Sequence, residues 1–229
     1  MLPTKTELTL EEFLALGEGE GDITYELIDE QAVPKLSPKK FHSRLTRSLI
    51  KLLEQWGEER GEIGVEWAVR LTRLGRDWVP VPDLLYVSYE RLSPDWNQDE
   101  VCPVVPELVI EIISAEQTFG QLAAKARNYL DAQVLRVWVV DSKARSITVF
   151  YPDAAPQTYM GDTLLKDPLF EGLEITASQL FPMAKIPPKF SENRDFLNKS
   201  GLGIFYFLMA THIRDKADSG KWGFIPDRI

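Results

Sequence analysis

The sequence has few of the residues that form disulfides or bind transition metals. Its 229 residues include one cysteine, Cys102, and two histidines. One cysteine cannot form a disulfide within the chain, and a zinc site made of cysteine and histidine would lack ligands. The sequence therefore predicts that any metal site uses carboxylate ligands.

Long apolar runs and an excess of positive charge are missing as well. No segment reaches the roughly 18 apolar residues that a membrane-spanning helix needs, and MLPTKTELTLEEF at the start has no signal-peptide pattern. We therefore expect a cytoplasmic protein that does not enter membranes. The formal net charge of −9 argues against a protein that coats nucleic acid non-specifically, because such binding needs a cationic surface. It does not exclude an acidic enzyme with a local basic face.

The composition is that of an ordinary globular protein. With 44% hydrophobic and 27% charged residues, the chain can bury one substantial core. We expect residues 1–185 to form one domain, because KIPPKFSENRD (185–195) is typical of a linker. Residues 186–229 would then be an extension, either a disordered or divergent tail or an apolar segment that docks on the core or on a partner.

Local sequence patterns predict an α/β protein. A capping box from Thr9 to Glu12 opens a short helix that should end near Leu16. Period-two alternation and apolar runs predict strands, and 3.6-residue periodicity predicts helices. The predicted strands are two short ones within 23–37, then 62–72, 79–87, 106–113, 134–141 and 146–152, and the longer helices are 40–56 and 118–131. From residue 40 onward the order is helix, three strands, helix, strand.

The helix predicted at 40–56 has two distinct sides. Its predicted buried stripe consists of Phe41, Leu45, Leu49, Leu52 and Trp56. Its basic side consists of Lys40, Arg44, Arg47 and Lys51. Such a charged stripe is most often a solvated surface, and the alternative is that it contacts phosphates.

Two carboxylates interrupt predicted strands that are otherwise apolar. Glu111 lies within LVIEII (108–113) and Asp83 lies within VPVPDLLYV (79–87). In a strand buried on both faces, a charged side chain is normally neutralised, paired or bound to a metal. If the strands pair, both acids can point to one place, and hard oxygen ligands there would suit Mg²⁺ or Mn²⁺. The alternative is that each acid lies at a strand end, hydrated or paired with arginine.

Several segments, taken in order, resemble the Uma2 (DUF820) family of restriction-endonuclease-like proteins, which is common in cyanobacteria. The segments that carry the resemblance are YELIDEQAV (25–33), SPKKFHSRL (37–45), VPD (81–83), PELVIEIIS (106–114), a helix with Lys125 and Tyr129, and VWVVD (137–141). The resemblance covers about residues 8–185. It implies the core of the PD-(D/E)xK nuclease superfamily, which is helix, three strands, helix and strand around a mixed central sheet, with an added N-terminal hairpin.

The resemblance also implies a metal site. Asp83, Glu111 and the backbone carbonyl of Ile112 would hold Mg²⁺ or Mn²⁺. Many relatives have a lysine two residues after the glutamate, where this chain has Ile113, and the lysine of the Uma2 pattern matches Lys125 instead. Glu26 and His42 match further polar positions of the family and would contact metal-bound water or the substrate. Gln121 and Tyr129, on the helix that carries Lys125, would lie near the substrate or support the site.

The sequence departs from the family pattern beside this site. The family usually has Ser-Pro-Ser-Thr where this chain has SAEQ (114–117), and an acidic residue where it has Gln121. These changes put substrate positioning in doubt. Structural alternatives also stay open: Glu26 as an exposed hairpin acid, His42 as a hydrogen-bonded core histidine, and Lys125 as a surface lysine.

The function that the resemblance implies is a metal-dependent endonuclease that hydrolyses DNA. A homodimer is expected on the same basis, because enzymes that cut both strands are commonly dimers. The alternative is a catalytically inactive nucleic-acid-binding or protein-interaction module on a nuclease fold.

Overall fold

The structure is a computed structural model in which residues 7–16, 23–35 and 37–188 are described. The chain divides into two units, Met1–Ile186 and Pro187–Ile229, and nearly all of the described residues belong to the first. The extension expected at 186–229 lies outside the described residues from position 189 onward. Within the described ranges, no helix combines the length and the hydropathy needed to cross a membrane.

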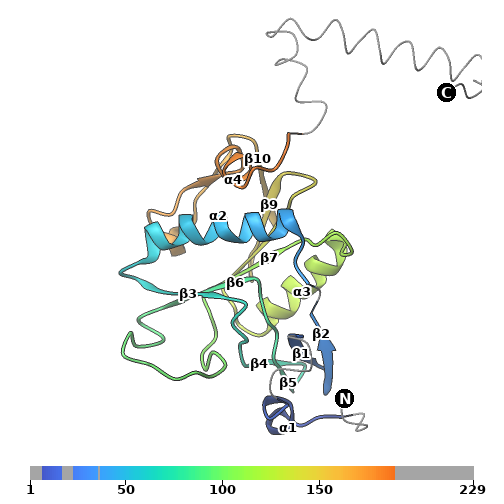
Figure 1. Cartoon of the computed structure of the whole chain (residues 1–229). Coiled ribbons are helices and arrows are strands. Elements are labelled where there is room, and N and C mark those ends of the chain that lie inside the picture. Colours follow the sequence, from blue (N-terminus) through green and yellow to red (C-terminus); the bar gives the residue numbers. More distant parts are fainter. Residues whose placement is uncertain (1–6, 17–22, 36, 189–229) are drawn as a thin grey trace, which may run out of the picture. The chain divides into compact units, whose positions relative to one another are not determined.

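A six-stranded sheet forms the centre of the first unit (Figure 1). In spatial order its strands are β10 (Gln157–Met160), β9 (Ser146–Phe150), β8 (Arg136–Asp141), β7 (Leu108–Ile112), β6 (Leu84–Ser88) and β3 (Gly61–Val65). Strands β7 and β8 run parallel, and the other neighbours in this sheet are antiparallel. The sheet is therefore mixed, and the parallel pair needs a crossover, which the helix between β7 and β8 supplies.

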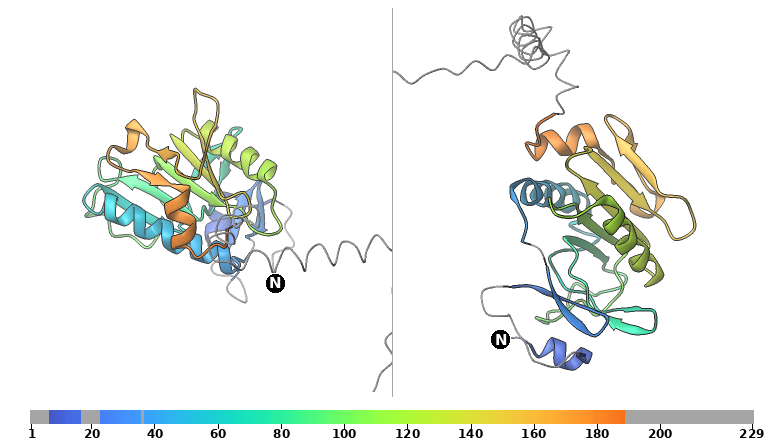
Figure 2. Two further views of the ribbon diagram at one scale, coloured as in Figure 1. Left: turned by 90° about the horizontal axis from the view of Figure 1, so that it is seen from above. Right: turned by 90° about the vertical axis from the view of Figure 1, so that its right-hand side faces the viewer.

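Helices cover both faces of this sheet (Figure 2). They are α2 (Lys40–Gly57), α3 (Phe119–Asp131) and α4 (Ala177–Met183). Helices α2 and α4 pack on one face, where Leu49 shares a core with Ile110 of β7. Helix α3 packs on the other face, where Leu122 shares a core with Val109. Both faces of β7 are therefore buried.

Two β-hairpins lie side by side at one end of the sheet (Figure 1). They consist of β1 (Tyr25–Ile28) with β2 (Gln31–Pro34), and β4 (Leu71–Arg73) with β5 (Arg76–Trp78). Each turns through two residues with positive φ, 29–30 and 74–75, as a type I′ turn requires. A bridge between Leu27 and Val79 fixes the first hairpin against the segment that leads into β6.

The remaining elements are short. They are α1 (Leu10–Leu14), β11 (Leu164–Leu165), the 3₁₀ helix η1 (Pro168–Phe170) and β12 (Ile175–Thr176). The predicted capping box is present in α1, where the Glu12 N–H donates to Thr9 Oγ1 and the Glu12 carboxylate accepts from the Thr9 N–H. This helix ends at Leu14, two residues before the predicted end.

The predicted order of helix, three strands, helix and strand is confirmed for the elements of the six-stranded sheet and its helices. The β4–β5 hairpin between β3 and β6 was not predicted, and two strand predictions were too long. The strand predicted at 62–72 ends at Val65, because Glu66 has a φ of 48° and turns the chain away from the sheet. The strand predicted at 79–87 begins at Leu84. Pro80 and Pro82, which cannot donate to a strand ladder, precede it. Asp83 is therefore next to a strand and not within one.

The buried stripe predicted for α2 was wrong in detail. Phe41 is 42% exposed, and Leu52 and Trp56 are only partly buried. The fully buried leucines are Leu45, Leu49 and Leu53. The stripe is shifted by one residue at its ends, so the helix turns His42 inward in place of Phe41.

Candidate active site

The sheet register brings the two predicted metal ligands opposite each other. The last pair of the β6–β7 ladder joins Leu84 to Ile110, so one step further along the same register would place Asp83 opposite Glu111. Both side chains are buried, at 3% and 4% exposure. Alternate residues of a strand share a face, so Glu111 lies on the same face as Val109, which is the face that α3 covers.

The carboxylate of Asp83 is held by three groups. Its Oδ2 accepts a hydrogen bond from the Ile112 N–H at 2.7 Å and lies 2.9 Å from His42 Nε2. Its Oδ1 lies 2.9 Å from the Lys35 ammonium. Burial alone would raise the pKa of Asp83, but the His42 hydrogen bond, the Lys35 charge and the Ile112 N–H together hold that pKa at about 2. Asp83 is therefore ionised at neutral pH, and His42 Nε2 must carry the proton that it donates.

Glu111 is held from the side of α3. The Tyr129 hydroxyl donates to its Oε1 at 2.8 Å, and Lys125 Nζ lies 2.9 Å from the same oxygen. Burial raises the pKa of Glu111. The positive charge of Lys125 lowers this pKa, and the negative charges of Asp83 and Glu26 raise it further. The two central acids therefore have environments that move their pKa values in opposite directions.

Glu26 reaches the same place from the N-terminal hairpin. Its Oε1 accepts a hydrogen bond from the Val81 N–H at 2.9 Å and another from Lys125 Nζ at 2.8 Å. The side chain is buried, so the alternative of an exposed hairpin acid is wrong. Lys125 thus bridges Glu26 and Glu111, with 21% of its side chain exposed, and is not a lysine lying along the surface.

Lys35 is a site residue that the sequence prediction missed. It directly follows β2, and its Nζ lies 3.2 Å from Glu66 Oε1 as well as 2.9 Å from Asp83 Oδ1. Only 14% of its side chain is exposed. No motif marks this lysine, because it comes close to Asp83 only through the folding of the hairpin against the sheet.

Both lysines are cations at neutral pH. Burial would lower the pKa of Lys125, but Glu111 and Glu26 outweigh it and raise the pKa. Burial would likewise lower the pKa of Lys35, and Asp83 and Glu111 raise it. The pKa of Tyr129 is raised well above its ordinary value, first by burial and then by Glu111. These three groups can therefore donate hydrogen bonds and, for the lysines, supply positive charge, but they cannot act as bases near pH 7.

A cavity of about 270 Å³ gives access to Asp83. His42, Ser43, Thr46, Arg47 and Glu66 are among the residues that line it with Asp83. A second cavity, of about 450 Å³, runs between α2 and the end of α4. Arg47 lines both cavities, so its side chain lies between Asp83 and the basic side of α2.

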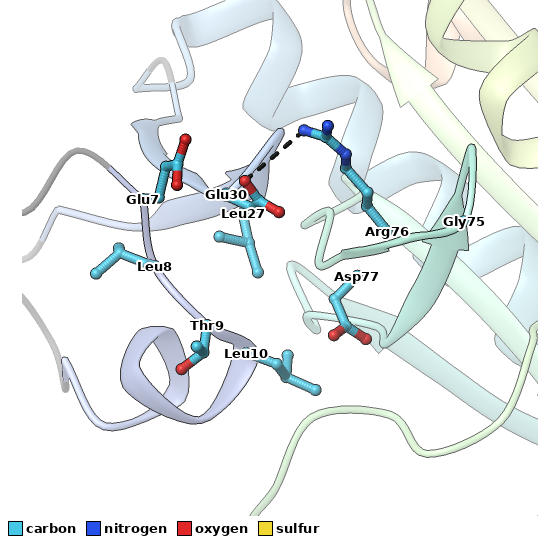
Figure 3. A pocket seen from close by; sticks show the side chains of 9 residues that line it. All are labelled: Glu7, Leu8, Thr9, Leu10, Leu27, Glu30, Gly75, Arg76 and Asp77. Atoms are coloured by element: carbon cyan, nitrogen blue, oxygen red, sulfur yellow. Dashed lines mark ion pairs between the residues drawn. The ribbon is translucent and has the colours of Figure 1, made fainter.

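The basic side of α2 faces this second cavity with three of its four predicted members. Arg44, Arg47 and Lys51 line it, joined by Lys185 from the end of α4. Lys40, at the first turn of α2, is exposed and is not part of that lining. A different cavity, of about 430 Å³, lies between the start of α1 and the second hairpin (Figure 3). It contains the ion pair between Arg76 and Glu30 and none of the predicted site residues.

A comparison with known protein families matches residues 10–178 to Uma2, described as "Putative restriction endonuclease". The chain belongs to the Uma2 family. A crystal structure described as that of "a putative nuclease belonging to DUF820", from Anabaena variabilis ATCC 29413, has a similar fold with a TM-score of 0.67. The two chains share 21% sequence identity, and the match covers 77% of this chain and 99% of the other. No curated protein matches the chain.

The structural likeness confirms the predicted restriction endonuclease-like fold of this Uma2 protein. Of the predicted site residues, the structure brings together Glu26, His42, Asp83, Glu111, Ile112, Lys125 and Tyr129. It does not bring Gln121 to them. The Gln121 side chain accepts from the Thr118 N–H at 2.8 Å and caps α3, and it is exposed. Its interpretation as a substrate residue therefore has no support from the geometry.

A second acid in the same segment, Glu107, is buried for a structural reason. It accepts hydrogen bonds from the Ser88 N–H at 3.1 Å and the Ser88 hydroxyl at 2.6 Å, and its Oε1 lies 2.9 Å from Arg91 Nε. These contacts join the start of β7 to the end of β6. Burial of an acid in this Uma2 protein is therefore not by itself a sign of a metal ligand.

Asp83 and Glu111 offer carboxylate oxygens, which are the donor atoms that hard divalent cations prefer. Asp83, Glu111, Glu26 and Glu66 surround the two ammonium groups of the lysines, so negative charge is in excess. Glu111 uses Oε1 for its contacts, and its Oε2 accepts no hydrogen bond within the described residues. The N–H and C=O of one strand residue point the same way, so the Ile112 carbonyl faces the Asp83 side. No group of three or more acidic, histidine or cysteine side chains in the described ranges is arranged as a ready-made metal cage.

Proposed function

We propose that the protein is a cytoplasmic endonuclease that hydrolyses phosphodiester bonds in DNA with the help of Mg²⁺ or Mn²⁺. The observation that carries this proposal is the convergence of two buried carboxylates, Asp83 directly before β6 and Glu111 in the adjacent β7, with Lys125 joining Glu111 to Glu26. Membership of a family described as "Putative restriction endonuclease" supports it.

Asp83, Glu111 and the carbonyl of Ile112 would hold the metal ion. When bound, such an ion supplies positive charge to the phosphate and makes a bound water more acidic. His42 keeps Asp83 ionised and fixes its orientation through the hydrogen bond to Oδ2. Tyr129 fixes the orientation of Glu111 through its hydrogen bond to Oε1. These residues therefore hold the two ligands in place and do not themselves react.

Lys125 would act on the substrate. Its ammonium is protonated at neutral pH and is positioned by two carboxylates, so it keeps its place without the substrate. Negative charge grows on the phosphoryl oxygens as the attacking water approaches phosphorus, and a fixed cation stabilises that charge. The role of Lys125 is therefore electrostatic, with a second function in orienting the water.

The basic side of α2 would hold the DNA backbone. Arg44, Arg47, Lys51 and Lys185 line one cavity, and Arg47 also lines the cavity that opens onto Asp83. Phosphates bound along this side would lead the strand toward the two carboxylates. This arrangement supplies the local cationic surface that an acidic protein needs in order to bind DNA.

The test is cleavage of supercoiled plasmid by purified protein with Mn²⁺, compared with Asp83→Asn. Asp77→Asn is the matched control, because Asp77 is an exposed aspartate on β5. We expect cleavage by the wild type and by Asp77→Asn, none by Asp83→Asn, and none in EDTA. Cleavage that persists in Asp83→Asn would come from a contaminant and would refute the assignment.

One observation favours the inactive alternative, a DNA-binding module without catalysis. Lys35 and Lys125 already pair with Asp83 and Glu111, so part of the negative charge is balanced without a metal ion. On this alternative, the protein binds DNA in a salt-dependent way, binds no Mn²⁺ at Asp83, and leaves plasmid intact.

A further inference from the structure

The contacts of Lys35 bear directly on metal binding. The Lys35 N–H donates to the Thr24 carbonyl at 2.8 Å, which fixes its backbone beside the first hairpin. From there the side chain reaches Asp83 Oδ1 at 2.9 Å and Glu66 Oε1 at 3.2 Å. Asp83 is buried, whereas 43% of the Glu66 side chain is exposed. The ammonium therefore lies between a buried acid and a hydrated one.

Asp83 has only one oxygen to offer a metal ion. Its Oδ2 already serves His42 and the Ile112 N–H, and both bonds are part of the fold around the site. Its Oδ1 is the remaining ligand atom, and Lys35 occupies it. Lys125 differs in this respect, because it contacts Oε1 of Glu111 while Oε2 stays available.

We propose that Lys35 competes with the divalent metal ion for Oδ1 of Asp83 and thereby sets the metal affinity of the site. This inference rests on the proposed function, because it takes Asp83 as a metal ligand. A buried carboxylate needs a cation on this oxygen, and an ammonium group and a divalent ion are alternatives for it.

Glu66 gives the displaced ammonium a second partner. It lines the cavity that opens onto Asp83, and it already shares Lys35 with Asp83. When a metal ion takes Oδ1, Lys35 can remain on Glu66 at the wall of this cavity without being left unpaired. Replacing Lys35 by a metal ion on Oδ1 therefore breaks the ion pair between Lys35 and Asp83 and leaves the ion pair between Lys35 and Glu66 intact.

The test measures binding of Mn²⁺ alone by isothermal titration calorimetry, without DNA. Lys35→Met removes the competing charge and keeps most of the side-chain length. We expect its Mn²⁺ dissociation constant to fall about tenfold, which corresponds to about 1.4 kcal/mol. Lys39→Met is the matched control, because Lys39 pairs with the exposed Glu116. We expect the control to stay within about twofold of the wild type.

A second measurement separates competition from a purely structural role. In EDTA, Lys35→Met should melt at a lower temperature than the wild type, because Asp83 loses its cation. Saturating Mn²⁺ should then raise its melting temperature more than it raises that of the wild type. If Lys35→Met fails to fold, Lys35→Gln removes the charge while keeping a hydrogen-bond donor, and the same tightening is expected.

The outcomes distinguish this inference from the proposed function. Mn²⁺ binding that is unchanged or weaker in the Lys35 variant, with a normal wild-type site, overturns the competition and leaves the metal site standing. Absence of Mn²⁺ binding in both wild type and variant overturns the competition together with the metal site. Tight binding in the variant and weak binding in the wild type supports both.

Discussion

Replacing Asp83 by asparagine should destabilise the metal-free protein by roughly 2 kcal/mol at neutral pH. The pKa of Asp83 is about 2 in the folded protein, against an ordinary value of 3.8. Each tenfold change in proton affinity corresponds to about 1.4 kcal/mol, so the difference between these two pKa values means that the contacts of the ionised carboxylate stabilise the fold by roughly 2 kcal/mol. Asparagine keeps the shape and one acceptor, but it removes the charge that Lys35 neutralises.

The sign of the pH dependence follows from the lowered pKa. The contribution of ionised Asp83 to the free energy of unfolding is nearly complete above pH 4 and is lost as the pH falls through the pKa of Asp83 in the folded protein. The difference in unfolding free energy between wild type and Asp83→Asn should therefore narrow to about half by pH 3. For a domain of this size, 2 kcal/mol at neutral pH corresponds to a decrease in melting temperature of about 4–8 °C.

The assay is urea unfolding in EDTA, followed by tryptophan fluorescence at pH 7, 4 and 3. Asp77→Asn, on the exposed surface of β5, is the control and should change stability by less than about 0.5 kcal/mol. An Asp83→Asn protein as stable as the wild type at pH 7 would show that the contacts of Asp83 do not stabilise the fold. If the difference in unfolding free energy between wild type and Asp83→Asn stays constant between pH 4 and pH 3, the charge of Asp83 is not what stabilises the wild type.

Three further predictions follow from the site. Glu111→Gln should keep or raise the free energy of unfolding in EDTA at neutral pH. Burial raises the pKa of Glu111, so its ionised form destabilises the folded state more as the pH rises. The same variant should lose Mn²⁺ binding, measured by calorimetry. Lys125→Ala should still bind Mn²⁺ but lose plasmid cleavage, and cleavage at the wild-type rate would remove this lysine from the mechanism. Reversing the charge of both Arg47 and Lys51 should weaken DNA binding and leave the melting temperature unchanged. The slope of the logarithm of the DNA-binding constant against the logarithm of the salt concentration should fall in magnitude by about 2. An unchanged slope would identify a solvated helix surface.

The sequence predicted most of the fold because the relevant signals are local. Apolar periodicity located α2, α3 and the central strands, and the capping residues located the start of α1. The errors occurred where the backbone sets the ends of a strand. The positive φ of Glu66 ends β3 earlier than predicted, and Pro80 and Pro82 make β6 begin later than predicted. Hydrophobic periodicity reports neither effect: the positive φ of Glu66 is a property of the folded backbone, and the prolines act by lacking the N–H that a strand ladder needs.

The site was predicted less completely than the fold. Asp83 and Glu111 were recognisable as charges among apolar neighbours, and the family resemblance singled out Lys125 and Glu26. Lys35 was not recognisable, because a lysine after a short strand is ordinarily solvated and only the packing of the first hairpin buries it. The helix-capping contact of Gln121 was not predicted, because an amide at this position suits either a helix cap or a ligand contact, and its substrate role stays a prediction.

The ion pair between Glu26 and Lys125 joins residues 99 positions apart in the chain. A ribosome must therefore synthesise the whole span from the first hairpin to the end of α3 before this cluster can form. Contacts of such long range are made late in folding, since the entropy of closing the intervening loop must be overcome first. A nascent or fragmented chain would carry Asp83 and Glu111 without Lys125 in position. On the proposed function, the emerging polypeptide could therefore not cleave nucleic acid before Lys125 has been synthesised and α3 has packed against the sheet.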